Sequence, residues 1–369
     1  MRLALVINTY PPRLGGLENH VAALAQGLRD LGHEVWVLTL SDAPDLRDDD
    51  GVRVLTGRGY LPIAEVISFP RVGTTRRIAR FLREKRIDIV GTHTRFFPMS
   101  LVGLRAAHMV GIPVIHTEHG SGFVANPSPI IFAGSRAVDL TMGRYVLRHA
   151  DRLLAISAQS AAFVKRLGGV DAEVFHNAIP APEPSPSAPE RPGHLVFVGR
   201  VVAGKGWDAF LASVAALRER GIDVDGELLG AGAQLEEARA MARELGIDGV
   251  VKIPGRVPPS QVRQALAGAT LVNPTVLSEG FQTTLLEAIA ENGRVVTYEV
   301  PGAQILADEG APVVITPGRS AESLADSLAA MLASPPALAP SELIEQWTWP
   351  VRSRQYADIL AEVIRDHRG

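Results

Sequence analysis

Short apolar runs alternate with amphipathic stretches along the first half of the chain. The run Leu3–Ile7 is continuous, as expected of a parallel strand covered on both faces, and Val35–Leu40 is a second such run. Between them, apolar residues recur at helical spacing from Leu17 to Leu31, and Gly32 ends the pattern. Three further runs follow: Ile87–Val90, Val114–His116 and Leu153–Ile156. The pattern predicts strands joined by helices, beginning with a βαβ unit.

The same alternation starts again in the second half. A buried strand is predicted at Leu195–Val198, followed by a glycine-containing loop and a helix from about Trp207 to Arg220. The remaining predicted strands are Glu227–Leu229, Val250–Ile253, Thr270–Val272, Val295–Thr297 and Val313–Ile315. Two similar α/β halves predict two doubly wound domains.

A proline-rich stretch, Pro180–Pro192, separates the two halves. Proline at this density is typical of a semi-rigid, non-helical linker. We therefore predict a first domain over residues 1–178, a linker over 179–193 and a second domain over 194–346. Residues 347–369 form an amphipathic C-terminal helix, which could stay on the second domain or pack on the first.

Composition narrows the classes of function. The chain has 369 residues, enough for two domains, and no cysteine, which excludes a disulfide scaffold, a thiolate metal site and a cysteine nucleophile. The net charge of −3 disfavours a nucleic-acid partner. Residues 1–176 carry 21 Lys and Arg against 16 Asp and Glu, whereas the remainder carries 16 against 24, so the first half is basic. The apolar N-terminal run is too short for a signal peptide or a membrane span, and we expect a cytoplasmic protein.

Two carboxylates eight residues apart, Glu279 and Glu287, flank a predicted helix start near Gln282. Helical rise separates them by roughly 12 Å or somewhat less, whereas paired glycosidase carboxylates stand about 5 to 9.5 Å apart. The pair is better suited to the two ends of a long ligand. The helix amides, with Thr283 and Thr284, would hold phosphate between them, as a nucleotide-sugar requires. The alternative is an exposed glutamate at a helix start and another on a helix surface.

The segment Gly199–Gly206 directly follows a predicted strand and nearly matches a phosphate-binding P-loop. Gly206 stands where that motif has the hydroxyl residue that binds Mg²⁺, so the metal ligand that an ATPase needs at this position is missing. What remains is a loop presenting Arg200 and Lys205, which suits a diphosphate leaving group. A solvated turn is the alternative.

Glycine and histidine residues follow strands of the first half. Gly15 and Gly16 precede the first helix without the G-x-G-x-x-G dinucleotide pattern, so they allow either close approach to a ligand or a plain turn. His93 and His119 each lie just past a strand, where α/β folds place ligands, although a lone histidine is more often structural. A zinc site built on His116, Glu118 and His119 is not favoured, because no further element completes it.

These motifs together resemble retaining glycosyltransferases of the GT4 type, which have the GT-B fold. The resemblance covers nearly the whole chain, and the Glu279-x7-Glu287 signature is its most specific part. The other matching segments are Pro12–Glu18, Gly32–Val35, Asp88–His93, Ala150–Ser157, His176–Ile179 and Phe197–Gly206.

The resemblance implies an α/β fold with two Rossmann-like domains facing across a cleft, and a role for each matching residue. Arg200 and Lys205 would hold the donor diphosphate, and Glu287 the ribose hydroxyls. Glu279 would meet the sugar hydroxyls, and His119 would contact the transferred sugar. The other expected donor-side residues are Gly16, Arg256, Gly280, Phe281, Gln282, Thr283 and Thr284. Tyr10, Gly15 and His93 are expected on the acceptor side. No metal or other cofactor is expected, and a UDP- or GDP-sugar is the expected donor.

Departures from the family pattern concern the segment after Glu287 and the sugar pocket. Val300–Gln304 lacks the second Gly-Gly and the glutamate that the family often has there. Gln282 replaces a frequent glycine, so its side chain could crowd or hydrogen-bond the sugar and bias the choice of donor.

The acceptor stays open among a glycan, a lipid-linked hydroxyl and a small molecule. The basic stretch Thr75–Arg86 predicts a partly amphipathic helix, which could lie on an anionic membrane or simply present a solvated face above a core stripe. Two alternatives to a transferase also stay open. One is a sugar phosphorylase or nucleotide-sugar epimerase on the same fold, and the other is a non-catalytic subunit that binds nucleotide-sugar.

Overall fold

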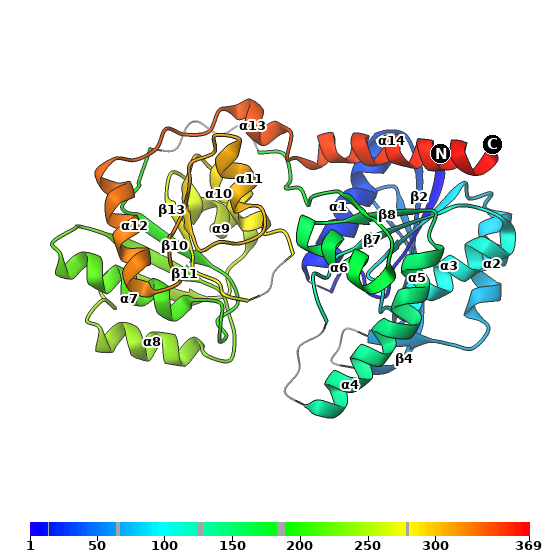
Figure 1. Ribbon diagram of the computed structural model, residues 1–369, viewed down its shortest axis with the longest axis horizontal. Helices are drawn as coiled ribbons and strands as arrows, with labels where there is room; N and C mark the ends of the chain where they lie inside the picture. The colour runs from blue at the N-terminus through cyan, green and yellow to red at the C-terminus, as the bar shows by residue number, and fades with distance from the viewer. Residues whose placement is uncertain (14, 64–66, 124–127, 183–188, 278–279) are drawn as a thin grey trace. The chain divides into compact units, whose positions relative to one another are not determined.

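The computed structural model describes residues 1–369 except 14, 64–66, 124–127, 183–188 and 278–279 (Figure 1). The chain forms two compact units. The first combines Met1–Pro180 with Trp349–Gly369, and the second is Ala181–Thr348. The C-terminal helix therefore belongs with the N-terminal unit.

The first unit is built on a mostly parallel sheet in the order β3-β4-β2-β1-β6-β7-β8-β9. Its strands are β1 (Arg2–Val6), β2 (Glu34–Ser41), β3 (Asp45–Asp49), β4 (Val52–Ile63), β5 (Ile67–Pro70), β6 (Ile89–His93), β7 (Val114–Glu118), β8 (Arg152–Ala155) and β9 (Glu173–Val174). β3 and β5 pair antiparallel with β4, whereas the other pairs are parallel. The hydrophobic strands β1, β2, β6 and β7 lie in the middle, so the core forms on both faces of the sheet.

Helices cover both faces of this sheet. They are α1 (Gly16–Asp30), α2 (Thr74–Glu84), α3 (Pro98–Val110), α4 (Pro129–Val138), the π-turn η1 (Asp139–Gly143), α5 (Arg144–His149), α6 (Ala158–Gly168) and α14 (Trp349–Arg368). α14 packs on α1 along one face, where a Cβ on Gly27 would lie 2.0 Å from the Ser353 hydroxyl. α2 and α3 contribute to the core on the other face. α14 is thus part of the first unit's core.

The second unit has a parallel sheet in the order β12-β11-β10-β13-β14-β15. Its strands are β10 (His194–Val198), β11 (Asp225–Leu229), β12 (Val251–Gly255), β13 (Thr270–Asn273), β14 (Arg294–Thr297) and β15 (Val313–Ile315). Its helices are α7 (Trp207–Glu219), α8 (Leu235–Glu244), α9 (Pro259–Leu266), α10 (Thr283–Ala290), α11 (Ala303–Asp308), α12 (Ala321–Ala333) and α13 (Ser341–Glu345). The direction of the strand order reverses between β10 and β13, which is the ligand-binding point of doubly wound sheets.

The amphipathic helix α2 resolves one alternative left by the sequence. Its apolar residues Ile78, Ala79 and Leu82 are buried in the core, and its arginines point outward. The helix therefore has no free apolar face to insert into a bilayer. Among the described residues, none of the helices combines the length and the apolar composition needed to cross a membrane.

Candidate functional site

The loop after β10 is fixed tightly against the loop after β13 in the second unit. Gly204 and Gly206 both have positive φ values, 81° and 84°. A Cβ on Gly206 would lie 2.2 Å from the carbonyl oxygen of Pro274, so only glycine fits there. The Val276 amide donates a hydrogen bond to the Gly204 carbonyl at 2.9 Å. The two loops that meet at the switch point of this sheet therefore hold one another in place.

A small cavity of about 180 Å³ opens between these loops and the start of α10. Its lining residues are Phe197, Val198, Lys205, Asn273, Phe281, Gln282, Thr283 and Thr284. The first amides of a helix have no partner inside the helix and carry partial positive charge. An ammonium group beside a helix N-terminus, at the carboxyl ends of two parallel strands, makes the cavity suited to a phosphate group.

Two side chains of the predicted signature shape this cavity. The Asn273 Nδ2 group donates hydrogen bonds to Gln282 Oε1 at 2.5 Å and to Thr297 Oγ1 at 3.0 Å, so the Gln282 side chain is held at the cavity wall. Phe281 stacks on Trp347 with the ring centroids 5.2 Å apart. This stacking anchors the loop that leads into α10.

Glu287 lies one turn after Thr283 on α10 and is hydrogen-bonded by it. Burial raises the pKa of the Glu287 carboxyl, while the Thr283 hydrogen bond and the Arg263 charge act in the opposite direction. A half-buried carboxylate on this helix is a ready acceptor for ligand hydroxyl groups.

The other residues of the second unit that are expected on the donor side lie on loops that follow its strands. Arg200 and Arg256 are exposed, on the loops that follow β10 and β12. Gly280 is half-buried directly before Phe281. Glu279 lies outside the described residues. The structure thus brings Lys205, Phe281, Gln282, Thr283 and Thr284 together around one cavity, with Glu287 on the same helix.

The loop after β1 leads to the switch point of the first unit's sheet. Tyr10 on this loop is 7% exposed and packs in the core, and its burial, with the nearby Asp49 charge, raises its pKa to about 12. Gly15 precedes α1, where a Cβ would meet the Glu18 carboxylate at 2.2 Å. A Cβ on Gly16 would meet nothing within 4 Å, so this helix start stays open to an approaching group.

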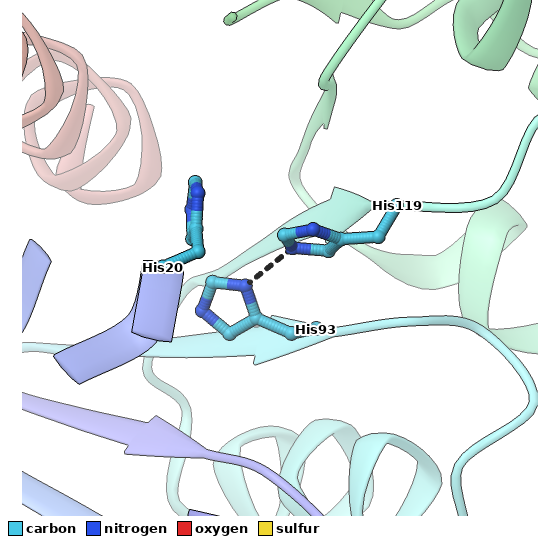
Figure 2. Close-up of side chains that lie close together, drawn as sticks. All are labelled: His20, His93 and His119. Atoms are coloured by element: carbon cyan, nitrogen blue, oxygen red, sulfur yellow. Dashed lines mark hydrogen bonds between the residues drawn. The ribbon is translucent and has the colours of Figure 1, made fainter. Parts of the chain in front are cut away.

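Three histidines converge beside this loop (Figure 2). His93 Nδ1 and His119 Nε2 share a hydrogen bond at 3.2 Å, and the His20 ring lies 4.8 Å from the His119 ring, centroid to centroid. His20 Nδ1 bonds Asn177 Oδ1 at 2.9 Å, and its ring packs edge-on against Trp349. His20 and His93 are buried, whereas His119 is partly exposed. His119 is therefore the member of the cluster that a ligand can reach.

The cluster is neutral at physiological pH. Burial lowers the pKa of His20 to about 4, and burial together with the charges of the neighbouring histidines lowers the pKa of His93 and of His119. One nitrogen from each ring lies within 4.8 Å of the others, close enough for the three rings to approach a common metal ion. Neutral imidazoles also donate and accept hydrogen bonds, which suits contact with a sugar hydroxyl.

Sequence reasoning missed two parts of this region. His20 was not singled out, because it lies within the helix that follows the glycine pair and looks like part of a helix surface. Arg95 was not singled out either, yet it is fully buried. Its guanidinium bonds Glu118 and Asp139, each at 2.9 Å. The one signal in the sequence is the position of Arg95, two residues after His93 and just past the end of a predicted strand.

The Arg95 ion pairs fix the loop that carries His119. Glu118 also accepts hydrogen bonds from the backbone amides of Gly120, at 2.7 Å, and Arg95, at 3.1 Å. Burial alone would raise the pKa of Glu118, but the Arg95 charge, His116 and the Gly120 amide outweigh it and lower the pKa to about 2. Glu118 is thus committed to Arg95 and to the loop that leads to His119.

Comparison with known protein families gives two adjacent matches. The model of Glycosyltransferase Family 4 matches residues 14–181, and the model of Glycosyl transferases group 1 matches residues 192–334. The two matched segments together span most of the chain, and each falls within one half.

Similar curated proteins are glycosyltransferases. The chain is 27% identical over 370 residues to the phosphatidyl-myo-inositol mannosyltransferase of Mycolicibacterium smegmatis, covering 96% of this chain and 92% of that protein. It is 26% identical over 319 residues to the phosphatidylinositol N-acetylglucosaminyltransferase GPI3 subunit of Saccharomyces cerevisiae, covering 81% and 68%. It is 28% identical over 363 residues to the D-inositol 3-phosphate glycosyltransferase of Kribbella flavida, covering 87% and 83%.

Solved structures of the same fold cover the whole chain. HepE of Anabaena in complex with UDP superposes with a TM-score of 0.75 at 16% identity, covering 98% of this chain and all of that one. The sucrose-phosphate synthase of Thermosynechococcus elongatus gives a TM-score of 0.73 at 18% identity, with 99% of each chain covered. The fold of the present chain is therefore that of the GT-B glycosyltransferases. Because both family models match, the chain belongs to the GT4, or group 1, glycosyltransferases.

Proposed function

We propose that this enzyme transfers a sugar from a nucleotide-diphosphate-sugar to an acceptor hydroxyl, with retention of the anomeric configuration and without a divalent metal. The observation that supports it most is the cavity at the start of α10, which sets Lys205 beside a helix N-terminus. A diphosphate leaving group gains negative charge in the transition state, and fixed cationic groups stabilise that charge. UDP or GDP is the proposed nucleotide, and HepE, solved with UDP and with UDP-glucose, supports the choice of UDP.

Each donor-side residue has a proposed task. Lys205 and the amides of Thr283 and Thr284 hold the phosphates, and the exposed Arg200 closes on them from the same loop as Lys205. Glu287 accepts hydrogen bonds from the ribose hydroxyls. The sugar lies toward Phe281 and Gln282, where the fixed Gln282 amide group selects among hydroxyl configurations. Glu279 is proposed to bind the sugar hydroxyls, as the family pattern implies.

The first unit supplies the acceptor side in this proposal. His119 contacts the transferred sugar, held in orientation by its hydrogen bond to His93. The open helix start at Gly16 admits the donor phosphates or the acceptor. In a retaining transfer on one face, the acceptor hydroxyl loses its proton to the departing phosphate oxygen as the new glycosidic bond forms.

The proposed acceptor is an inositol ring that carries a phosphate or a phosphatidyl group. Three relatives named above act, by their names, on phosphatidylinositol, phosphatidyl-myo-inositol or D-inositol 3-phosphate. A phosphatidyl acceptor requires the enzyme to work at a membrane surface. We therefore propose a cytoplasmic enzyme that binds the membrane peripherally.

The test is a product assay with UDP- and GDP-sugars in EDTA, offering D-inositol 3-phosphate or phosphatidylinositol vesicles as acceptor. We expect release of one nucleotide only when an acceptor is present, and a glycoside whose anomeric proton coupling matches that of the donor. Turnover that needs free phosphate would indicate a phosphorylase, and donor conversion without acceptor would indicate an epimerase. Binding of donor without consumption under all these conditions would indicate a non-catalytic subunit. A requirement for divalent metal would overturn the metal-free mechanism.

A further inference from the structure

Helix α4 of the first unit exposes apolar side chains along its length. Ile130 is 82% exposed and Ile131 is 51% exposed, and Phe132 and Val138 are exposed as well. At about 100° per residue, Ile130, Ile131 and Val138 fall on one face of the helix, together with Gly134 and Ala137. An apolar face of this kind on the outside of a domain marks an interaction surface.

Contacts among the described residues anchor the helix to the domain near its C-terminal end. At its C-terminal end it continues into η1, where Asp139 is bound by the buried Arg95. Arg136 places its guanidinium over the Phe123 ring, 4.5 Å from its centroid, which ties the opposite face of the helix to the domain. Figure 1 shows α4 projecting away from the sheet of its unit. The exposed apolar face therefore lies on the side of the helix away from these contacts.

The charges around α4 favour an anionic partner. From residue 119 to residue 138 the chain has no Asp or Glu, and its one Lys or Arg is the exposed Arg136. Arg144, exposed, follows on α5. An apolar face flanked by arginine and free of acidic groups is typical of a segment that lies in the interface of an anionic bilayer.

We propose that α4 inserts its Ile130–Ile131–Val138 face into the surface of an anionic lipid bilayer, with Arg136 and Arg144 meeting the headgroups. The proposal rests on the proposed lipid-linked acceptor and names the part of the chain that reaches it. The sequence left membrane contact by α2 as one of two alternatives, and the apolar stripe of α2 is in the core. Through Asp139, Arg95 and Glu118, the inserted helix is connected to the loop that carries His119.

Vesicle binding tests the proposal directly. The full chain is mixed with phosphatidylcholine vesicles with and without phosphatidylserine, and the bound fraction is measured by co-sedimentation. We expect binding to the anionic vesicles that weakens with salt. The double variant Ile130→Asp/Ile131→Asp should bind the vesicles at least about tenfold more weakly than the wild type, because each isoleucine buried in the bilayer supplies a large part of the affinity. Met109→Asp, which changes an exposed apolar residue on α3 of the same unit, should bind like the wild type.

A spectroscopic readout separates insertion from mere adsorption. The four tryptophans of the chain are buried, so Ile130→Trp adds one exposed reporter on α4. Its emission should shift to shorter wavelength when anionic vesicles are added. Unchanged emission, or equal binding by the double aspartate variant, would overturn the proposal. Self-association that is lost in the double variant without any vesicle binding would also overturn it, in favour of a second copy of the chain.

The outcome is independent of the proposed chemistry. Transfer to the water-soluble acceptor D-inositol 3-phosphate does not need the membrane, so the double variant should keep it. Vesicle binding without transfer to any acceptor would leave the docking surface standing and refute the proposed function. Transfer to the soluble acceptor without α4-dependent vesicle binding would do the reverse.

Discussion

Replacing Arg95 by methionine should destabilise the first unit strongly. The guanidinium is fully buried and bonds the equally buried carboxylates of Glu118 and Asp139, each at 2.9 Å. Methionine keeps much of the volume but removes the charge, and it leaves two carboxylates without their partner. The ordering of the His119 loop depends on the same bonds, since Arg95 also donates to the Gly122 carbonyl at 3.0 Å.

The size of the expected loss follows from the burial of the ion pair. Breaking a buried ion pair by removing one partner costs about 3–5 kcal/mol. Arg95, His116 and the Gly120 amide together lower the pKa of Glu118 from 4.5 to about 2 against the effect of burial, which corresponds to about 3 kcal/mol of free energy of unfolding shared among these groups. Because the folded pKa is depressed, this stability is present above pH 4.5 and is lost as the pH falls toward 2. In the Arg95→Met variant the carboxyl takes up a proton more easily, so its deficit relative to the wild type should shrink between pH 7 and pH 4.

Urea unfolding at pH 7 and at pH 4, followed by tryptophan fluorescence, measures both effects. The matched control is Lys165→Met, which breaks the 2.7 Å ion pair to Asp171 between two exposed side chains of the same unit. That loss should stay below about 1 kcal/mol. An Arg95→Met variant that loses no more stability than the control at pH 7, or whose loss is the same at both pH values, would contradict a stabilising role for the buried ion pairs.

Three further predictions concern the site. Gly206→Ala should weaken nucleoside-diphosphate binding measured by calorimetry, because the new Cβ would clash with the Pro274 carbonyl. Gly221 has a similar φ of 76° with open space around it, so the control Gly221→Ala should leave binding intact. Because the pKa of His20 in the folded state is lowered to about 4, the wild type should lose about 3 kcal/mol of free energy of unfolding between pH 6.5 and pH 4. His20→Gln should flatten this pH dependence, and an unchanged slope of the unfolding free energy against pH, measured by urea unfolding, would contradict the prediction. Glu287→Gln should weaken UDP or GDP binding about tenfold, and the variant should no longer distinguish a 2′-deoxy nucleotide; continued discrimination would remove the ribose role.

The hydrophobic pattern predicted most strands of the parallel sheets, because strands covered on both faces read as continuous apolar runs, but it missed β4, which pairs parallel with β2. Leu195–Val198 and Val313–Ile315 are examples that the structure places in β10 and β15. The pattern failed at the edge of the first sheet. β3 has the sequence Asp45-Leu-Arg-Asp-Asp49, which carries no strand signal, and forms because the edge of β4 offers hydrogen-bonding partners.

The candidate site could be predicted where its chemistry is local in sequence. The loop Gly199–Gly206 and the segment Phe281–Glu287 each follow a strand, and topology then sets both at one switch point. The histidine cluster could not be predicted, because His20, His93 and His119 come from three elements whose packing no spacing encodes. The burial of Arg95 was equally hidden, since charged residues are rarely buried without partners and both partners lie far along the chain.

Isothermal titration of UDP and GDP in EDTA tests whether the cavity at the start of α10 binds the donor diphosphate. We expect one of the two nucleotides to bind with 1:1 stoichiometry, and we expect Lys205→Met to weaken this binding about tenfold or more. Absence of binding for both nucleotides, or equal affinity in the wild type and the Lys205→Met variant, would contradict it.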